Sequence, residues 1–124
     1  MRTSIIEING AKHILCFNLW ALEECLERFG SLSAMADAMT KGTAKENMAN
    51  ALWVLETLQK GGKLYSDEMG MDNAEPVSAE KMRIVCGADF FVDLKSKIMS
   101  AVNSGMSTNV KSEDSKNVET TQAE

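Results

Sequence analysis

The dipeptide Asn9-Gly10, set between two apolar-rich runs, constrains the fold of this chain more than any other stretch. Asn-Gly is the strongest short signal for a two-residue hairpin, because a type I′ turn needs a positive φ at both central residues. The sequence therefore predicts a hairpin over residues 4–17. The expected cross-strand pairs are Ile8 with Ala11, Ile6 with His13 and Ser4 with Leu15 on one face, and Glu7 with Lys12 and Ile5 with Ile14 on the other. The first face is the more apolar, with Phe17 following it, so it is expected to face the core.

A two-stranded hairpin is marginal in water by itself, so it has to pack on other elements, and the pattern that follows is helical. Four helices are expected, at about 19–29, 32–40, 44–60 and 78–103. Their starts are marked by N-cap residues, which are Asn18, Ser31 or Ser33, Thr43 in a capping box with Glu46, and Ser78. Glycines mark the expected ends of the first three helices at Gly30, Gly42 and Gly61-Gly62. The predicted fold class is mainly α with an N-terminal β-hairpin (α+β), the hairpin packing on a bundle of about four helices.

The predicted core stripes follow helical spacing. In the first helix the stripe is Leu19, Leu22, Leu26 and Phe29. In the third helix it is Met48, Leu52, Leu55 and Gln59, with Ala51 and Leu58 beside it. In the last helix it is Ile84, Ala88, Phe91, Leu94, Ile98 and Val102, which is broad enough to predict that this helix is the centre of the domain. Residues 63–77 are expected to form a loop, residues 1–103 a single domain, and residues 104–124 a disordered polar tail.

Charge and composition exclude several classes of protein. The net charge of −5 and the absence of a basic cluster disfavour general nucleic-acid binding. No apolar run is long enough to cross a bilayer, and the N-terminus has no signal-peptide pattern, so a cytosolic protein is expected. The three cysteines, Cys16, Cys25 and Cys86, have no metal-binding or redox spacing and are expected to be reduced and structural.

No catalytic constellation is recognisable, so no catalytic, cofactor-binding or metal-binding residue is predicted and enzymatic activity is not expected. The only histidine, His13, is expected to be a packed or surface residue. The glycines lack the Gly-Lys-Ser/Thr sequence of a phosphate loop. The acidic residues of the loop do not alternate as in a calcium-binding EF-hand, which favours a solvated surface; these are Asp67, Glu68, Asp72 and Glu75.

Trp53 is the main candidate for partner binding. Helical rotation places it opposite the Met48–Leu52–Leu55 stripe, among polar residues that include Asn50 and Thr57. A tryptophan in such a place is either covered by another element or offered to a partner, since Trp is enriched at binding hot spots. Trp20 is also off its stripe, and the adjacent hairpin is the favoured cover for it. The nine methionines include several at core spacing, and flexible thioethers also suit a surface that adapts to a partner.

The order of elements resembles the small tail assembly chaperones of siphophage-like phages and prophages of Gram-positive bacteria. The similar features are Ile6 to Ile8, Asn9-Gly10, Ile14 to Phe17, Asn18, and Phe29-Gly30-Ser31, followed by the "ALWVLE" helix and a loop before the last helix. The resemblance covers residues 4–102 in layout and is sharpest over about the first 40. Two departures are His13, where an aromatic residue is common, and the methionine-rich helices.

The resemblance implies a non-enzymatic binding protein of the host bacterial cytosol that is absent from the mature virion. Its partners would be the tape-measure protein, kept soluble by the chaperone, and the tail-tube protein. Another phage structural or tail-completion protein is the alternative, and gene order distinguishes the two. The hairpin edges are expected to be free, and an open edge can accept a neighbour's strand, so a homo-oligomer is a further expectation.

Overall fold

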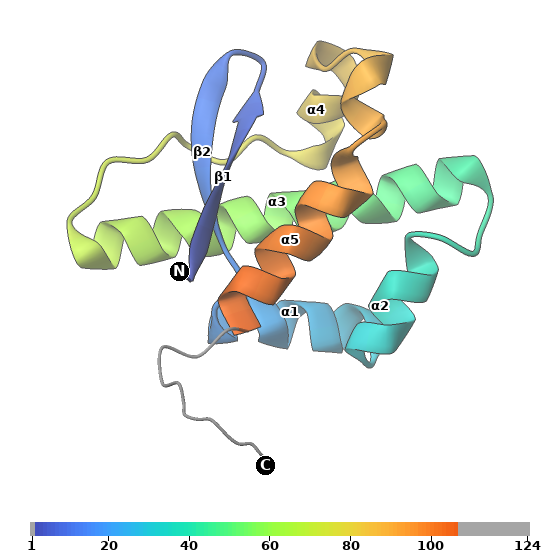
Figure 1. Cartoon of the computed structure of the whole chain (residues 1–124), viewed down its shortest axis with the longest axis horizontal. Coiled ribbons are helices and arrows are strands. Elements are labelled where there is room, and N and C mark those ends of the chain that lie inside the picture. The colour runs from blue at the N-terminus through green and yellow to red at the C-terminus, as the bar shows by residue number, and fades with distance from the viewer. Residues whose placement is uncertain (1, 107–124) are drawn as a thin grey trace.

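The computed structural model describes residues 2–106 and confirms the predicted α+β fold class (Figure 1). An antiparallel hairpin comes first and helices follow it. The elements are β1 (Thr3–Ile8), β2 (Ala11–Cys16), α1 (Leu19–Phe29), α2 (Leu32–Ala38), α3 (Ala44–Met69), α4 (Ala79–Val85), the 3-10 helix η1 (Ala88–Phe91) and α5 (Leu94–Met106). Most of the predicted polar tail, residues 107–124, lies outside the described residues.

The hairpin has the predicted register, including the pairs Ile6 with His13 and Ile5 with Ile14. Asn9 has a φ of 50° and Gly10 a φ of 87°, as the type I′ turn requires. The predicted core face is buried at Ile6, Ile8, His13, Leu15 and Phe17. The alternation of the strands therefore decided which face lies on the helices.

The centre of the molecule is α3, which contacts β2, α1, α2, α4 and α5. Figure 1 shows α3 as the long helix behind the hairpin and α5, which cross it in front. The prediction that the last helix is the centre was wrong. A 26-residue helix offers several faces along its length, and each neighbour takes a different one.

Gly61-Gly62 does not end α3, contrary to the sequence prediction, and the helix continues to Gly70, where φ is 71°. Both glycines are buried, and β2 passes directly over them. A Cβ added at Gly61 would meet the carbonyl oxygen of Cys16, and one at Gly62 would overlap the carbonyl oxygen of Ile14. Glycine is therefore needed at both positions, because the backbone of β2 packs directly against the backbone of α3 there and leaves no room for a side chain.

The segment after α3 is extended and is held by side-chain amides. The buried side chain of Gln59 forms two hydrogen bonds with the backbone of Val77. Its Oε1 accepts from the Val77 N–H (2.7 Å), and its Nε2 donates to the Val77 carbonyl (3.0 Å). The Asn73 side chain bonds the backbone of Ile14 in the same way: its Oδ1 accepts from the Ile14 N–H (2.8 Å), and its Nδ2 donates to the Ile14 carbonyl (3.2 Å). The loop predicted over 63–77 is therefore helical in its first part and clamped onto the body in its second.

The helix predicted over 78–103 is wrong as a single element, although Ser78 caps its start as expected. Cys86 and Gly87 are extended, with ψ of 143° and 167°, so the chain changes direction before η1 and α5. Ile84 of the predicted stripe consequently faces solvent at 78% exposure, and so does Val92, next to Phe91 of that stripe, at 79%. The helix also runs three residues past the predicted end, with Gly105 packed on the carbonyl of Phe17.

In α1 the predicted caps are confirmed, and the predicted stripe is confirmed at Leu22 and Phe29, which are half-buried against the core, but not at Leu19 and Leu26. Asn18 Oδ1 accepts from the Ala21 N–H (3.0 Å), and Gly30 ends the helix at a φ of 90°. The buried residues are Ala21 and Cys25, whereas Leu19 is 77% exposed and Leu26 is also exposed. The small residues Ala21 and Cys25 lie fully inward where α1 packs on α3, while Leu19 and Leu26 lie toward solvent. The capping box of Thr43 and Glu46 is confirmed at the start of α3.

Candidate partner-binding surface

Two apolar hollows lie beside the N-terminal third of α3, on the two sides of Phe91. One hollow of about 290 Å³ is bounded by α3, α4, η1 and the start of α5. A second hollow of about 310 Å³ lies between the α2–α3 region and the start of α5. Phe91 lines both hollows, so we name them together the Phe91 trough.

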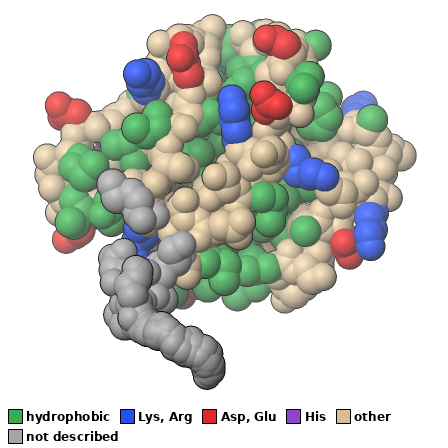
Figure 2. All heavy atoms as spheres, viewed as in Figure 1, with side chains coloured by type: hydrophobic (Ala, Val, Ile, Leu, Met, Phe, Trp, Pro, Cys, Tyr) green, Lys and Arg blue, Asp and Glu red, His purple; other side chains and the backbone are tan. Residues whose placement is uncertain are grey.

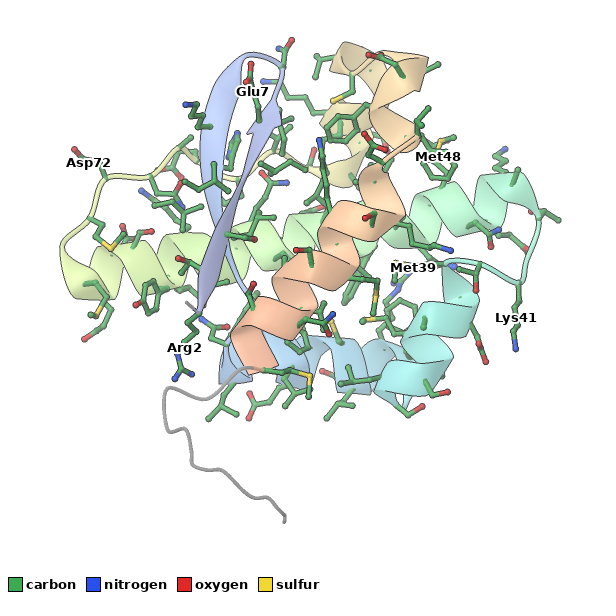
Figure 3. The ribbon with its side chains drawn as sticks, in the orientation of Figure 1. Arg2, Glu7, Met39, Lys41, Met48 and Asp72 are labelled. Atoms are coloured by element: carbon green, nitrogen blue, oxygen red, sulfur yellow. The ribbon has the colours of Figure 1, made fainter. Side chains whose placement is uncertain are left out.

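One face of α3 forms the floor of the Phe91 trough. Its residues recur at helical spacing, and they are Ala44, Asn47, Met48, Ala51 and Leu52. The other apolar walls come from the end of α2, from α4 and from the η1–α5 segment, and they include Met39, Met82, Phe90, Val92 and Leu94. Figure 3 shows Met48 on α3 and Met39 at the end of α2. Figure 2 shows hydrophobic side chains gathered at the upper right, over the segment between α4 and α5.

The size and shape of the hollows favour side chains of a protein partner over an enclosed small molecule. Small-molecule pockets are ~300 to 1,000 Å³ and bury most of their ligand. Each hollow here is at the bottom of that range and opens to the surface. Three methionines line them, Met39, Met48 and Met82, and thioether side chains adjust their shape to what they contact.

The charge of the Phe91 trough differs in sign from the charge of the whole chain. Arg83 lines one hollow and Lys95 the other; among residues 2–106 no Asp or Glu lines either hollow, although the carboxylate of Asp89 lies near Cys86, which lines the first. The chain as a whole has a net charge of −5. An apolar segment flanked by carboxylates therefore fits this surface better than a basic one.

Cys86 is the thiol of the Phe91 trough. It is partly buried and lines the hollow next to Arg83. Burial raises the pKa of the Cys86 thiol, and the nearby carboxylate of Asp89 raises that pKa further. Cys86 is therefore protonated at neutral pH and contributes mainly apolar surface.

Trp53, the main candidate from the sequence, lies on the other side of α3. Its ring meets Phe29 edge-on, with centroids 5.5 Å apart at 87°. The guanidinium of Arg28 lies 4.6 Å from the Trp53 ring centroid in a cation–π contact. The C-terminal end of α1 thus covers much of Trp53, which is half-buried.

The other three candidates from the sequence also have internal roles. Asn50 Nδ2 donates to the carbonyl of Ala38 at the end of α2 (3.0 Å). Thr57 is buried, and its hydroxyl donates to the Trp53 carbonyl (3.0 Å). Trp20 is half-buried against the core. The structure does not bring these residues to the Phe91 trough, and their role in partner binding stays a prediction.

The sequence pattern does not reveal the Phe91 trough, because it predicts a single helix over residues 78–103. In a straight helix Phe90 and Phe91 would lie along α3 as ordinary core. The signal that could have found the break is Gly87, which stands between two apolar runs directly after Cys86. A glycine inside a helical pattern lowers the helical stability by about 1 kcal/mol relative to alanine.

His13 is buried in the hairpin face, and neither of its ring nitrogens has a hydrogen-bond partner among residues 2–106. Burial lowers its pKa, so the imidazole is neutral in the folded protein at pH 7. Among residues 2–106 no group of three or more His, Cys, Asp or Glu side chains is placed to hold a metal ion. None of the helices in that range is both long enough and apolar enough to span a membrane.

Comparisons of the chain with protein-family models, with curated proteins and with solved structures found no match.

Proposed function

We propose that this protein is a phage tail assembly chaperone that holds an amphipathic helix of the tape-measure protein in the Phe91 trough. The observation that carries the proposal is the pair of open apolar hollows on one face of α3. Apolar side chains at successive turns of a client helix would enter the two hollows, which is how helix-in-groove recognition operates. The layout of residues 4–102, which resembles this family of chaperones, supplies the identity of the client.

The charges of the trough define the client helix further. Arg83 and Lys95 would pair with carboxylates that flank the client's apolar anchors. The client would be kept from self-association because its apolar face is covered until tail-tube subunits replace the chaperone. In this proposal the protein binds and releases its client in the host bacterial cytosol, performs no chemical step and is not retained in the virion.

Co-expression with the tape-measure protein tests the proposal. We expect the tape-measure protein to stay soluble and to co-purify with the chain. Replacing Met48 or Val92 by glutamate places a carboxylate at an exposed position of a hollow, and each change should weaken binding at least about tenfold, equivalent to about 1.4 kcal/mol.

The matched control is Leu64→Glu, which changes an exposed apolar residue of the same helix outside the trough. This variant should bind within about twofold of the unchanged chain, since surface substitutions away from a site have small effects. Binding that Leu64→Glu reduces as strongly as Met48→Glu would reject the Phe91 trough as the site. No co-purification of the unchanged chain with the tape-measure protein would reject the proposed client.

A further inference from the structure

The two outer edges of the hairpin are in different states. The outer edge of β2 is occupied at Ile14, because the Asn73 side chain forms hydrogen bonds with both the N–H (2.8 Å) and the carbonyl (3.2 Å) of Ile14. The carbonyls of Ile14 and Cys16 also lie on the glycine pair of α3. The expectation that both edges are free was therefore wrong for β2.

The edge of β1 is open. Ile14 turns its N–H and carbonyl away from β1, so its cross-strand partner Ile5 belongs to a pair that is not hydrogen-bonded across the hairpin. The N–H and carbonyl of Ile5 consequently point outward, and by alternation so do those of Thr3 and Glu7. Among residues 2–106 none bonds to these outward groups. In Figure 1 β1 lies in front of β2 and α3, and no other ribbon crosses it.

Apart from the charge of Glu7, the sequence of β1 lacks the features by which proteins protect an exposed strand edge. The strand TSIIEI contains no proline, no glycine and no lysine, and the structure shows no bulge in its pairing with β2. Ile5 is 64% exposed on the outer face of the hairpin. An unprotected edge with an exposed β-branched residue at its middle is a template for another strand.

We propose that β1 pairs with β1 of a second copy of this chain, antiparallel, about a two-fold axis at Ile5. In this register Ile5 lies opposite the partner's Ile5, and Thr3 lies opposite the partner's Glu7. All outward N–H and carbonyl groups of Thr3, Ile5 and Glu7 then gain partners. The two hairpins become one four-stranded sheet in the order β2-β1-β1-β2, which is more stable than a lone hairpin.

The side chains favour a second copy as the occupant. Ile14 and Ile5 are neighbours on the outer face, so the pairing joins them to their two-fold equivalents in one continuous apolar row across the sheet. Figure 3 shows Arg2 at one end of β1 and Glu7 near the other. Antiparallel pairing about Ile5 sets Glu7 opposite the uncharged Thr3 of the partner, whereas parallel pairing in register sets Glu7 beside Glu7.

Light scattering of the full chain across micromolar concentrations tests the pairing. We expect a reversible dimer, twice the 13.6 kDa of the chain, because a strand-edge interface is small. Ile5→Lys keeps an exposed position exposed but sets like charges at the two-fold axis, and it should give a monomer. Ile5→Pro removes an outward N–H without removing a bond within the hairpin, and it should do the same. The control Leu64→Lys should leave the dimer unchanged.

Disulfide trapping tests the register in a background carrying Cys86→Ser. Hydrogen-bonded antiparallel pairs have Cα atoms ~5.5 Å apart, within the range of a disulfide. Ile5→Cys should therefore give a covalent dimer on mild oxidation, and Glu7→Cys alone should not. A mixture of the Thr3→Cys and Glu7→Cys proteins should again crosslink.

A chain that stays monomeric at all concentrations, a dimer that Ile5→Lys leaves intact, or crosslinking of Glu7→Cys alone would each overturn the proposal. Circular dichroism of every variant establishes that the fold is retained, so loss of the dimer is assigned to the edge. The Phe91 trough and its client play no part in this inference, and either proposal can fail without the other.

Discussion

At the scale of single residues, burial decides the chemistry of the ionisable side chains. Cys25 is buried, and burial raises the pKa of its thiol to about 11, with the Glu24 carboxylate adding to the effect. His13 is buried with no hydrogen-bond partner in the described part of the chain, and burial lowers its pKa. Both groups are therefore neutral in the folded protein at pH 7 and act as parts of the core.

His13 makes stability depend on pH in a defined direction. As the pH falls below the usual histidine pKa of 6.5, His13 of the unfolded chain becomes protonated before His13 of the folded chain, because its pKa is lower in the folded protein. The free energy of unfolding should therefore be constant in this respect above pH 6.5 and fall as the pH drops below it. Denaturant unfolding between pH 7.5 and 5.5 measures this decline.

The control for this prediction is His13→Phe, which keeps an aromatic ring at the position and cannot titrate. Its unfolding free energy should change less over the same range of pH, because the carboxylates titrate mostly at lower pH. Equal slopes for the two proteins would show that His13 is not the source of the dependence.

At the scale of elements, contacts between backbones decide where helices end. The glycine pair 61–62 lies inside α3 because β2 rests on it, and a glycine elsewhere in a helix interior would only weaken the helix. The N-caps depend on a few neighbouring atoms, so Asn18, Thr43 and Ser78 were correctly predicted from the sequence. The continuation of α3 past residue 60 depends on a strand more than 40 positions earlier, and no local pattern carries that information.

Gly62→Ala should destabilise the protein by about 3 kcal/mol or more, at the upper end of overpacking costs. The added Cβ would overlap the backbone carbonyl of Ile14, which cannot move aside as a flexible side chain can. An exposed glycine in a helix would show the opposite sign, since alanine favours helix by about 1 kcal/mol. Urea unfolding gives the difference.

Leu64→Ala serves as the control, because Leu64 is an exposed residue two positions along the same helix. Its free energy of unfolding should be within about 0.5 kcal/mol of the unchanged chain. If Gly62→Ala were as stable as this control, the close packing of β2 on α3 would not exist in solution.

At the scale of the whole molecule, the hairpin and α5 cover one part of α3 and leave its N-terminal third beside open hollows. The three cysteines lie in both parts of the molecule: Cys16 and Cys25 are buried in the core, whereas Cys86 lines the Phe91 trough. Accessibility of each cysteine therefore measures whether the body and the trough are arranged as described.

Alkylation at pH 7.5 should modify Cys86 first and leave Cys16 and Cys25 unmodified until the chain unfolds. Burial raises the pKa of both protected thiols, to about 11 for Cys25, so their reactive thiolate is scarce in the folded state. Intact-mass spectrometry over time counts the adducts. Cys86→Ser should show none under native conditions, and rapid double labelling of the unchanged chain would contradict the arrangement.

The sequence by itself determined the features that depend on near neighbours. Asn9-Gly10 and the alternation around it set the turn, the register and the buried face of the hairpin. The turn type fixes which residues pair, and the two-residue alternation of side chains then allows only one face to be apolar. Short capping motifs likewise set the starts of the helices, and the α+β class followed from both.

Only the tertiary structure decided which helix is central, which leucines of α1 face solvent and where the chain breaks after Val85. In each case the sequence offers alternatives of similar apolar content, such as two faces of one helix or a straight and a broken helix. Packing against segments distant in the sequence decides between them. The Phe91 trough and the open edge of β1 are what that packing leaves uncovered. A pattern in one segment cannot specify them, because an uncovered surface is defined by every element that does not reach it.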